Sequence, residues 1–576
     1  MRLGASGGSN SAPNTTTTES GPQIPAAHFL LLLILLWAPF VRFVVIDHHY
    51  PLLRMEVMLV LGLLALVAGA LSRTKACSSS LPYAAIVAGL LTIQIDREWE
   101  SMESTSKLVP LGLFVLLTLI AWKIGAKFYL VLLASSGVFL GATVIQGALS
   151  SSNSLAIEYP TGGSVGEHPP RWIHLLLDEH LGPEAILPAT TAERRFRDEI
   201  RDVYARYGFK LYGRVYSHYN ETNDAIPNLL NFTRSTDRLA FVQGDKPPYR
   251  LMQNQYFHWL KREGYVVNAI SSGYLDICDE QYIDVKRCKN YQFGELRSLS
   301  TLEIPVLSKL TVLLGGYGTR YHRYRRVLGT YEDVVQPRLA AMGLPAPVVP
   351  KDSFWTWKRL LPLSVSAWAA LSDIWHDVLT LPPGHALFVH LLLPHDPFFL
   401  NQDCSIKQIQ EATGSSLFVD RLDAFEEVGR TRQELNEDYA NQGRCLYRKL
   451  EELFEGLQAN GMLDDSIIIV HGDHGARLGH LSPIHQELDK ANHQDFEDAF
   501  DTLFASRLPG ESSGYDTRAR SLPDVFFETL ARAGTTPPPN QMVDERPFVF
   551  LMLEEGTRFS AVPYPPAALR LRSEIQ

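Results

Sequence analysis

The stretch SIIIVHGDHGARLG, residues 466–479, is the most informative part of this 576-residue chain. Its first half, Ser466–Val470, is a short apolar run, typical of a β-strand buried on both faces. Polar residues follow at once, among them His471, Asp473 and His474. Because imidazoles and carboxylates are the usual ligands of zinc and manganese, this stretch predicts a buried strand that ends at a metal site.

Two further apolar runs have the same form: WIHLLL at 172–177, followed by Asp178-Glu179-His180, and LFVHLLL at 387–393, followed by Pro394-His395-Asp396. A single acidic residue after a strand is more often a helix cap than a ligand, but three such clusters, each with a histidine, favour a metal site. A helical pattern over residues 439–457 precedes the third strand and stops at Gly461. Strands that alternate with helices predict an α/β domain with a mainly parallel sheet, in which chemistry collects at the carboxyl ends of the strands.

A candidate nucleophile lies in SHYNETNDAIPNLLNF, residues 217–232. Thr222 comes just ahead of an expected helix start near Pro227, where a hydroxyl can face an anion held by backbone amides. Coordination to a divalent cation would lower the cost of forming its alkoxide. Taken alone, such a threonine is more often a helix cap. The triplet Asn220-Glu221-Thr222 is also a glycosylation sequon, and a glycan there would block the hydroxyl.

The first 150 residues are far more apolar than the rest, with runs at about 26–46, 55–72, 81–95, 108–122 and 127–148. A bilayer-spanning helix needs roughly 20 apolar residues, so the third run is the weakest candidate. Arg73 and Lys75 follow the second run, Lys123 and Lys127 separate the last two, and an acidic segment follows the third. The positive-inside rule then predicts five crossings of the cell membrane, with everything after residue 150 outside the cytoplasm; four crossings would leave it inside.

Composition predicts the domain boundaries. Residues 1–25 are small and polar and are expected to be disordered, 26–148 form a membrane domain, 149–170 a Ser-, Gly- and Pro-rich linker, 171–540 the α/β domain and 541–576 a C-terminal extension. The formal net charge is −10, and there is no basic stripe with interleaved aromatic residues, which argues against nucleic acid as a partner.

Four of the five cysteines lie in the soluble part, and the fifth, Cys77, lies in the membrane part. Two alternatives are open for the four: the disulfides Cys278–Cys288 and Cys404–Cys445, or separate buried thiols. Disulfides would place the domain in an oxidising compartment.

In this order the motifs resemble the alkaline phosphatase/sulfatase superfamily. SIIIVHGDHGARLG is similar to its strand followed by a metal-binding Asp-His-Gly, HLLLDEHLG at 174–182 to its first strand with the first acidic ligand, and LFVHLLLPHDPF to its middle strand. The likeness covers roughly residues 170–540. Five N-terminal spans and the T-x-x-x-I-P pattern at Thr222–Pro227 resemble, more narrowly, the lipoteichoic acid synthases and phosphoethanolamine transferases. No cysteine has the surroundings of the sulfatase nucleophile.

The resemblance implies an alkaline phosphatase-like fold and a set of site residues. Glu179, Thr222, Asp473 and His474 would bind the metal, zinc or manganese with magnesium as an alternative, and Asp178 is a second acidic candidate. Thr222 would also be the nucleophile, and His395 would bind the substrate phosphate or protonate the leaving group. His480 and His485 are further candidates for the substrate site, although loop histidines are more often solvated. The chain departs from the transferases in the triplet Asp178-Glu179-His180 and in Ala476, where many relatives carry an acid.

The implied function is that of an integral membrane enzyme. It would move a phosphoethanolamine- or phosphoglycerol-type headgroup from a membrane phospholipid to an envelope glycan or lipid, through a phosphothreonine-type intermediate. Two alternatives remain open: a membrane-tethered sulfatase-like hydrolase or phosphodiesterase with water as acceptor, and a non-catalytic envelope-binding protein.

Overall fold

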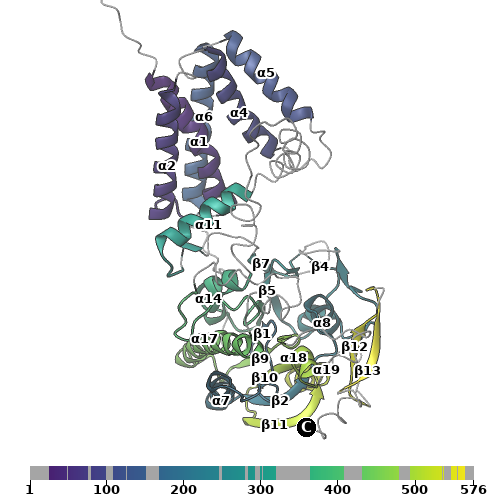
Figure 1. Ribbon diagram of the computed structural model, residues 1–576. Helices are drawn as coiled ribbons and strands as arrows, with labels where there is room; N and C mark the ends of the chain where they lie inside the picture. Colours follow the sequence, from purple (N-terminus) through teal and green to yellow (C-terminus); the bar gives the residue numbers. More distant parts are fainter. Residues whose placement is uncertain are drawn as a thin grey trace, which may run out of the picture. The chain divides into compact units, whose positions relative to one another are not determined.

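The structure is a computed structural model of the chain, drawn in Figure 1. It describes residues 25–48, 50–74, 80–98, 108–124, 126–150, 168–244, 249–278, 283, 285–291, 299–300, 302–319, 363–407, 431–478, 493–534, 536, 546–553 and 556–564. The chain forms two compact units, one of Met1–Asp47 with Val57–Ala148 and one of His48–Glu56 with Leu149–Gln576. The finer domain boundaries expected from composition stay a prediction.

The smaller unit consists of helices, and each of the five apolar runs is helical: α1 (Pro25–Arg42) with a π-helical continuation η1 (Phe43–Asp47), α2 (Met55–Ser72), α4 (Ser80–Glu98), α5 (Leu108–Ile124) and α6 (Ala126–Ser150). Among the described residues, three helical segments are long and apolar enough to cross a bilayer: His28–Ile46, Met55–Ser72 and Lys127–Gln146. The apolar segments Leu81–Leu91 and Leu113–Ile124 are shorter. The number of crossings therefore stays a prediction.

The larger unit is built on an eight-stranded sheet with the order β11-β2-β10-β9-β1-β8-β5-β7. Its strands are β1 (Arg171–Leu177), β2 (Lys210–Tyr216), β5 (Val266–Ser272), β7 (Arg287–Tyr291), β8 (His385–Leu391), β9 (Ser466–His471), β10 (Asp501–Arg507) and β11 (Gly514–Ser521). The expected mainly parallel sheet is confirmed, but the sheet is mixed, because β10 runs antiparallel to both of its neighbours.

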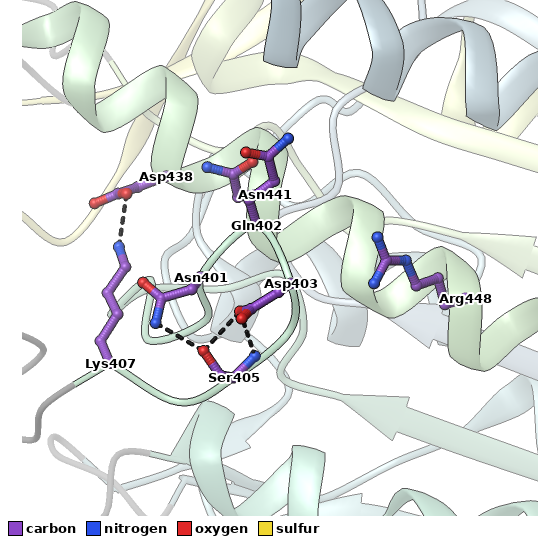
Figure 2. A pocket seen from close by; sticks show the side chains of 8 residues that line it. All are labelled: Asn401, Gln402, Asp403, Ser405, Lys407, Asp438, Asn441 and Arg448. Carbon is purple, nitrogen blue, oxygen red and sulfur yellow. Dashed lines mark hydrogen bonds and ion pairs between the residues drawn. The ribbon is translucent and has the colours of Figure 1, made fainter.

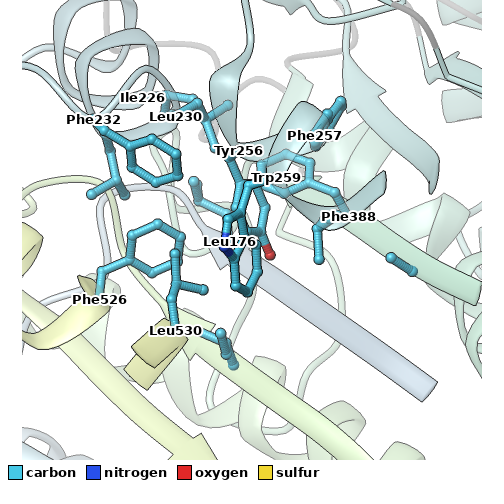
Figure 3. Packing of buried hydrophobic residues seen from close by; sticks show 14 of the residues in the cluster. Leu176, Ile226, Leu230, Phe232, Tyr256, Phe257, Trp259, Phe388, Phe526 and Leu530 are labelled. Atoms are coloured by element: carbon cyan, nitrogen blue, oxygen red, sulfur yellow. The ribbon is translucent and has the colours of Figure 1, made fainter. Parts of the chain in front are cut away.

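Helices cover both faces of this sheet (Figure 1). On one side lie α7 (Thr191–Arg206), α14 (Leu363–Leu379) and α17 (Arg432–Ala459), and α17 buries the expected leucine stripe of residues 446–457. On the other side α8 (Thr222–Leu230), α9 (Gln255–Arg262) and α19 (Leu522–Ala533) enclose an aromatic core that includes Trp259, Phe388 and Phe526 (Figure 3). Each such side chain contributes about 1.5–3 kcal/mol by its burial. This core holds the sheet and α8 in place.

The remaining elements are α11 (Val306–Thr319), α18 (His493–Phe500), a small sheet of β3 (Val242–Gln243), β4 (Tyr249–Leu251) and β6 (Leu275–Asp276), and a hairpin of β12 (Phe548–Met552) and β13 (Phe559–Pro563). The larger unit contains both disulfides, Cys278–Cys288 and Cys404–Cys445. Of the two alternatives for these four cysteines, the structure therefore has the two disulfides and not four separate thiols. Cys77 lies outside the described residues.

Candidate active site

The three strands identified in the sequence lie side by side, because β1 pairs in parallel with β8 on one side and β9 on the other. Leu176 of β1 is opposite His390 of β8 and also opposite His471 of β9. The carboxyl ends of the three strands therefore meet at one edge of the sheet. This register places the polar residues that follow each strand within reach of one another.

Thr222 lies at the centre of the resulting cluster. As the first residue of α8 it is only 3% exposed, and its Oγ1 is 3.2 Å from His474 Nε2 and 3.4 Å from Asp178 Oδ2. Asp178 and His474 are fully buried. Residues far apart in the chain thus converge on one hydroxyl group, and the predicted role of these residues as metal ligands stays a prediction.

The lone pairs in this cluster are arranged as a cation would require. His474 Nδ1 is 2.8 Å from the carbonyl oxygen of Gly475, so Nδ1 donates to that oxygen, and in the tautomer with its proton there the Nε2 lone pair is available to a cation. That Nε2 is 3.2 Å from Asp473 Oδ2. Asp473 Oδ2 and Asp178 Oδ1 are both buried, and neither accepts a hydrogen bond from the described residues. Buried carboxylate oxygens without a donor are costly unless they bind a cation.

The ligand atoms are also close enough together for one ion. Asp178, Glu179 and His474 each offer an atom within 4.8 Å of the others, and Glu179, His395 and Asp396 form a second such group. Glu179 belongs to both groups. Buried carboxylates with an imidazole are the donor set of zinc or manganese sites, so these residues fit a divalent cation.

The charges in the cluster shift the ionisation of its members. Burial raises the pKa of Asp473, and the neighbouring charge of Asp178 raises it further. For Asp178 burial also acts upward, but a hydrogen bond with His390 and three nearby imidazoles bring its pKa below the ordinary value. Burial lowers the pKa of His395, yet the carboxylates of Glu179 and Asp396 raise it to about 10. His395 is therefore cationic at neutral pH and can attract an anion.

Two residues at the site were missed by the sequence analysis. His390, inside β8, has its Nε2 2.9 Å from Asp178 Oδ2 and its Nδ1 3.3 Å from Ser272 Oγ, so it orients Asp178. Arg477 donates hydrogen bonds to Glu179 and Glu221. A histidine within the apolar run LFVHLLL, and a basic residue three positions after His474, were the available signals.

The sequence analysis also named other histidines and the sequon. His480 and His485 are outside the described residues. His180 points away from the cluster: its Nδ1 is 2.8 Å from the carbonyl oxygen of Leu181, its ring contacts Phe196, and burial lowers its pKa to about 4. Asn220 of the sequon is buried, so the folded chain has no room for a glycan there.

Figure 2 shows a separate polar cavity of about 780 Å³. It is lined by residues of α17 and of the loop after His395: Asn401, Gln402, Asp403, Ser405, Lys407, Asp438, Asn441 and Arg448. None of the clustered residues lines this cavity.

Comparison with known proteins shows similarity in sequence to lipoteichoic acid synthases. No family model matches the chain. The lipoteichoic acid synthases of Staphylococcus aureus strains USA300 and NCTC 8325 are each 30% identical to it over 118 residues, which is 20% of this chain and 18% of the synthase. The chain thus matches less than a fifth of the length of these curated relatives. The expected resemblance to lipoteichoic acid synthases is confirmed by this match.

Two solved structures are similar at a lower level. The C-terminal periplasmic domain of EcEptC from Escherichia coli, in complex with Zn, has 11% identity and a TM-score of 0.37, covering 67% of this chain and 90% of its own. The lipoteichoic acid synthase LtaP from Listeria monocytogenes has 11% identity and a TM-score of 0.36, covering 70% of this chain and 89% of its own. Because both TM-scores are below 0.5, we draw no conclusion from them.

Proposed function

We propose that this chain is a membrane-bound transferase that moves a phospho-headgroup from a lipid to a hydroxyl group of an envelope glycan or lipid. The headgroup is of the phosphoglycerol or phosphoethanolamine type, in keeping with the similarity to lipoteichoic acid synthases. The observation that carries the proposal is the position of the Thr222 hydroxyl, 3.2 Å from His474 Nε2 and 3.4 Å from Asp178 Oδ2. At the same edge of the sheet, two buried carboxylate oxygens have no donor among the described residues.

In this proposal Asp178, Asp473, His474 and Thr222 hold a divalent cation, with Glu179 close enough to join them. Zinc or manganese suits the donors best, and magnesium is the alternative. When bound, the cation supplies positive charge that favours an ionised hydroxyl and balances the phosphoryl oxygens.

The residues of the chain then carry out two in-line displacements. Thr222 Oγ1 forms a bond to phosphorus while the bond from phosphorus to the diacylglycerol oxygen breaks. The hydroxyl proton passes to Asp178 Oδ2, and His395 binds the phosphate or gives a proton to the departing oxygen. An acceptor hydroxyl next attacks the phosphothreonine-type intermediate, and the bond from phosphorus to Thr222 breaks. Thr222 Oγ1 takes back its proton from Asp178 Oδ2, and the acceptor proton passes to His395, where it replaces the proton given to the diacylglycerol oxygen.

The test uses the purified full chain, a phospholipid labelled in its headgroup, and an acceptor. Thr222→Ala should lower turnover by about 10³-fold or more while the melting temperature stays close to that of the wild type, and Thr222→Ser should retain part of the activity. Mass spectrometry should find the headgroup adduct on Thr222 of the wild type. Turnover by Thr222→Ala at the wild-type rate would remove this residue from the mechanism.

The same assay separates the transferase from the hydrolase. Transfer moves the label to a second molecule, whereas hydrolysis releases it as a free phospho-headgroup. Release without transfer in the presence of every acceptor tested would replace the transferase proposal by the hydrolase. Wild-type protein that binds no metal and forms no adduct would favour the non-catalytic binding protein.

A further inference from the structure

Arg477 bridges the two segments that carry the proposed reacting residues. Its Nε donates to Glu179 Oε1 at 3.2 Å, its Nη2 donates to the same oxygen, and its Nη1 donates to Glu221 Oε1 at 3.0 Å. Glu179 directly follows Asp178, and Glu221 directly precedes Thr222. The guanidinium group therefore connects the end of β1 with the beginning of α8.

This bridge is largely shielded from water. The Glu179 side chain is fully buried, that of Arg477 is 19% exposed, and that of Glu221 is 31% exposed, so the Glu179 half of the bridge is the more shielded one. Ion pairs at the surface contribute little, but loss of one partner of a buried pair leaves an uncompensated charge and is strongly unfavourable. The buried ion pair with Glu179 therefore fixes the guanidinium group of Arg477 in place. From this position the same group can hold a second carboxylate, that of Glu221.

Both partners of this buried ion pair, Glu179 and Arg477, have an unusual backbone conformation. Glu179 has φ 59° and Arg477 has φ 52°, the left-handed region that residues other than glycine seldom adopt. Tertiary contacts hold them there: the Glu179 amide donates to Asp473 Oδ1 at 3.1 Å, and the Arg477 amide donates to the carbonyl oxygen of Asp498 at 2.7 Å. Backbone conformations of this kind persist where the surroundings impose them, and they concentrate at functional sites.

The beginning of α8 lacks the usual side-chain cap. Glu221 occupies the N-cap position, but its side chain makes no capping hydrogen bond and pairs with Arg477 instead. By contrast, α7 and α17 begin with complete capping boxes at Thr190 and Thr431. At this helix start the Glu221 side chain is thus held by the arginine and not by a backbone amide.

We propose that Arg477 is a positioning residue, which holds Glu221 against Glu179 and thereby keeps the Thr222 hydroxyl within reach of Asp178. This inference rests on the proposed function, because the position of the hydroxyl matters only if Thr222 attacks phosphorus. A displacement of about 1 Å can cost about 100-fold in rate. Loss of the bridge should therefore lower kcat and leave KM for the lipid nearly unchanged.

The experiment compares Arg477→Gln, Arg477→Lys, Glu221→Gln and the double variant Arg477→Gln/Glu221→Gln in the full chain with the labelled lipid. Arg477→Gln should lower kcat and the rate of adduct formation on Thr222 by about 10–100-fold. Arg477→Lys should recover little, because a single ammonium lacks the planar fork that reaches both carboxylates. The double variant should lose no more than Arg477→Gln alone, since both substitutions break the same bridge.

A matched control is Arg518→Gln, which breaks a pair with Asp516 in which the arginine is 76% exposed, and which should leave kcat unchanged. The inference would be overturned if Arg477→Gln had the kcat of the wild type. It would also be overturned if the fold-decrease in kcat of the double variant equalled the product of the two single-variant decreases. If Arg477→Gln fails to fold, Glu221→Gln alone decides: a lowered kcat supports the bridge and a wild-type kcat overturns it. Turnover by Thr222→Ala overturns the proposed function instead, whatever the Arg477 variants do.

Discussion

At the residue scale, the main feature is a cluster of carboxylates collected inside the protein. Asp178, Glu179 and Asp473 are all buried, and two of their oxygens accept no hydrogen bond from the described residues. His395 and Arg477, which both lie beside Glu179, each offset part of this charge. Like charges buried together are stable only with an opposite charge nearby. The buried negative charge is therefore an electrostatic stress in the folded chain, and the cation of the proposed site would relieve it.

This stress predicts opposite effects of Asp473→Asn on stability and on metal binding. The asparagine side chain removes one buried charge, and its oxygen can still accept the hydrogen bond from the backbone N–H of Glu179. Its NH2 group takes the place of Asp473 Oδ2, which is 3.2 Å from His474 Nε2, and can donate to that nitrogen. We expect the metal-depleted variant to be more stable than the metal-depleted wild type by about 1–2 kcal/mol, while its metal content falls. Thermal unfolding with and without chelator, combined with elemental analysis, measures both effects.

The matched control is Asp464→Asn, because that carboxylate is 88% exposed and should affect neither property. If Asp473→Asn bound metal as well as the wild type, this residue would not be a ligand.

At the element scale, the hairpin β12–β13 supports the segment that leads to Thr222. The Phe550 amide donates to the carbonyl oxygen of His218, and the Phe550 ring stacks on Tyr219. At the other end of the hairpin, the hydroxyl of Tyr564 donates to Asp501, and its ring stacks on Tyr216 of β2. A segment expected to be a C-terminal extension thus packs against the α/β core.

The buried Asp501–Tyr564 contact predicts a loss of stability as the pH rises from about 4 to about 8. Burial, together with Glu497 and Asp498, outweighs the hydrogen bond from Tyr564 and the charge of Arg214 and raises the pKa of Asp501 to about 8. Because the folded pKa lies above the unfolded value, the contribution is fully present below about pH 4 and is lost as the pH rises through about 8.

Asp501→Asn imitates the protonated carboxyl, so its melting temperature should fall less than that of the wild type between pH 6 and 9. Hydrogen-exchange protection factors of β12 and β13, which are corrected for the intrinsic pH dependence of amide exchange, should be the same at pH 6 and pH 9 in the variant and lower at pH 9 in the wild type. Identical pH profiles for the two proteins would show that Asp501 does not titrate in this range.

At the scale of the whole molecule, apolar helices and disulfides belong to different units. The smaller unit carries helices long and apolar enough for a bilayer, and the larger unit carries Cys278–Cys288 and Cys404–Cys445. Disulfides persist in oxidising compartments. Both observations favour a larger unit outside the cytoplasm, which an odd number of crossings would produce.

The topology can be measured with a reporter enzyme that is active only outside the cytoplasm. Fused to the end of the full chain, the reporter should be active, and fused after Arg73, in a loop predicted to be cytoplasmic, it should be inactive. The four disulfide cysteines should resist alkylation in cells until a reductant is added. An inactive reporter at the end of the chain, with freely alkylated cysteines, would indicate an even number of crossings.

Local sequence by itself determined much of this protein. The strands β1, β8 and β9, the helix over residues 439–457 and the helical character of all five N-terminal apolar runs follow from hydrophobicity and its period along the chain, which depend only on neighbouring residues. The polar residues directly after the three strands were identifiable for the same reason, because parallel strands that lie together end at the same edge.

Only the tertiary structure decided which of those polar residues meet. Asp178 and Glu179 are neighbours in the chain, yet Asp178 faces Thr222 and His390 while Glu179 faces Arg477, because the backbone turns into the left-handed region at Glu179. His180 is as close in sequence but is directed into the core. Arg477 and Glu221 are 256 residues apart, and no local pattern can encode such a pairing. Their contact exists because the packed sheet brings the end of β9 beside the beginning of α8.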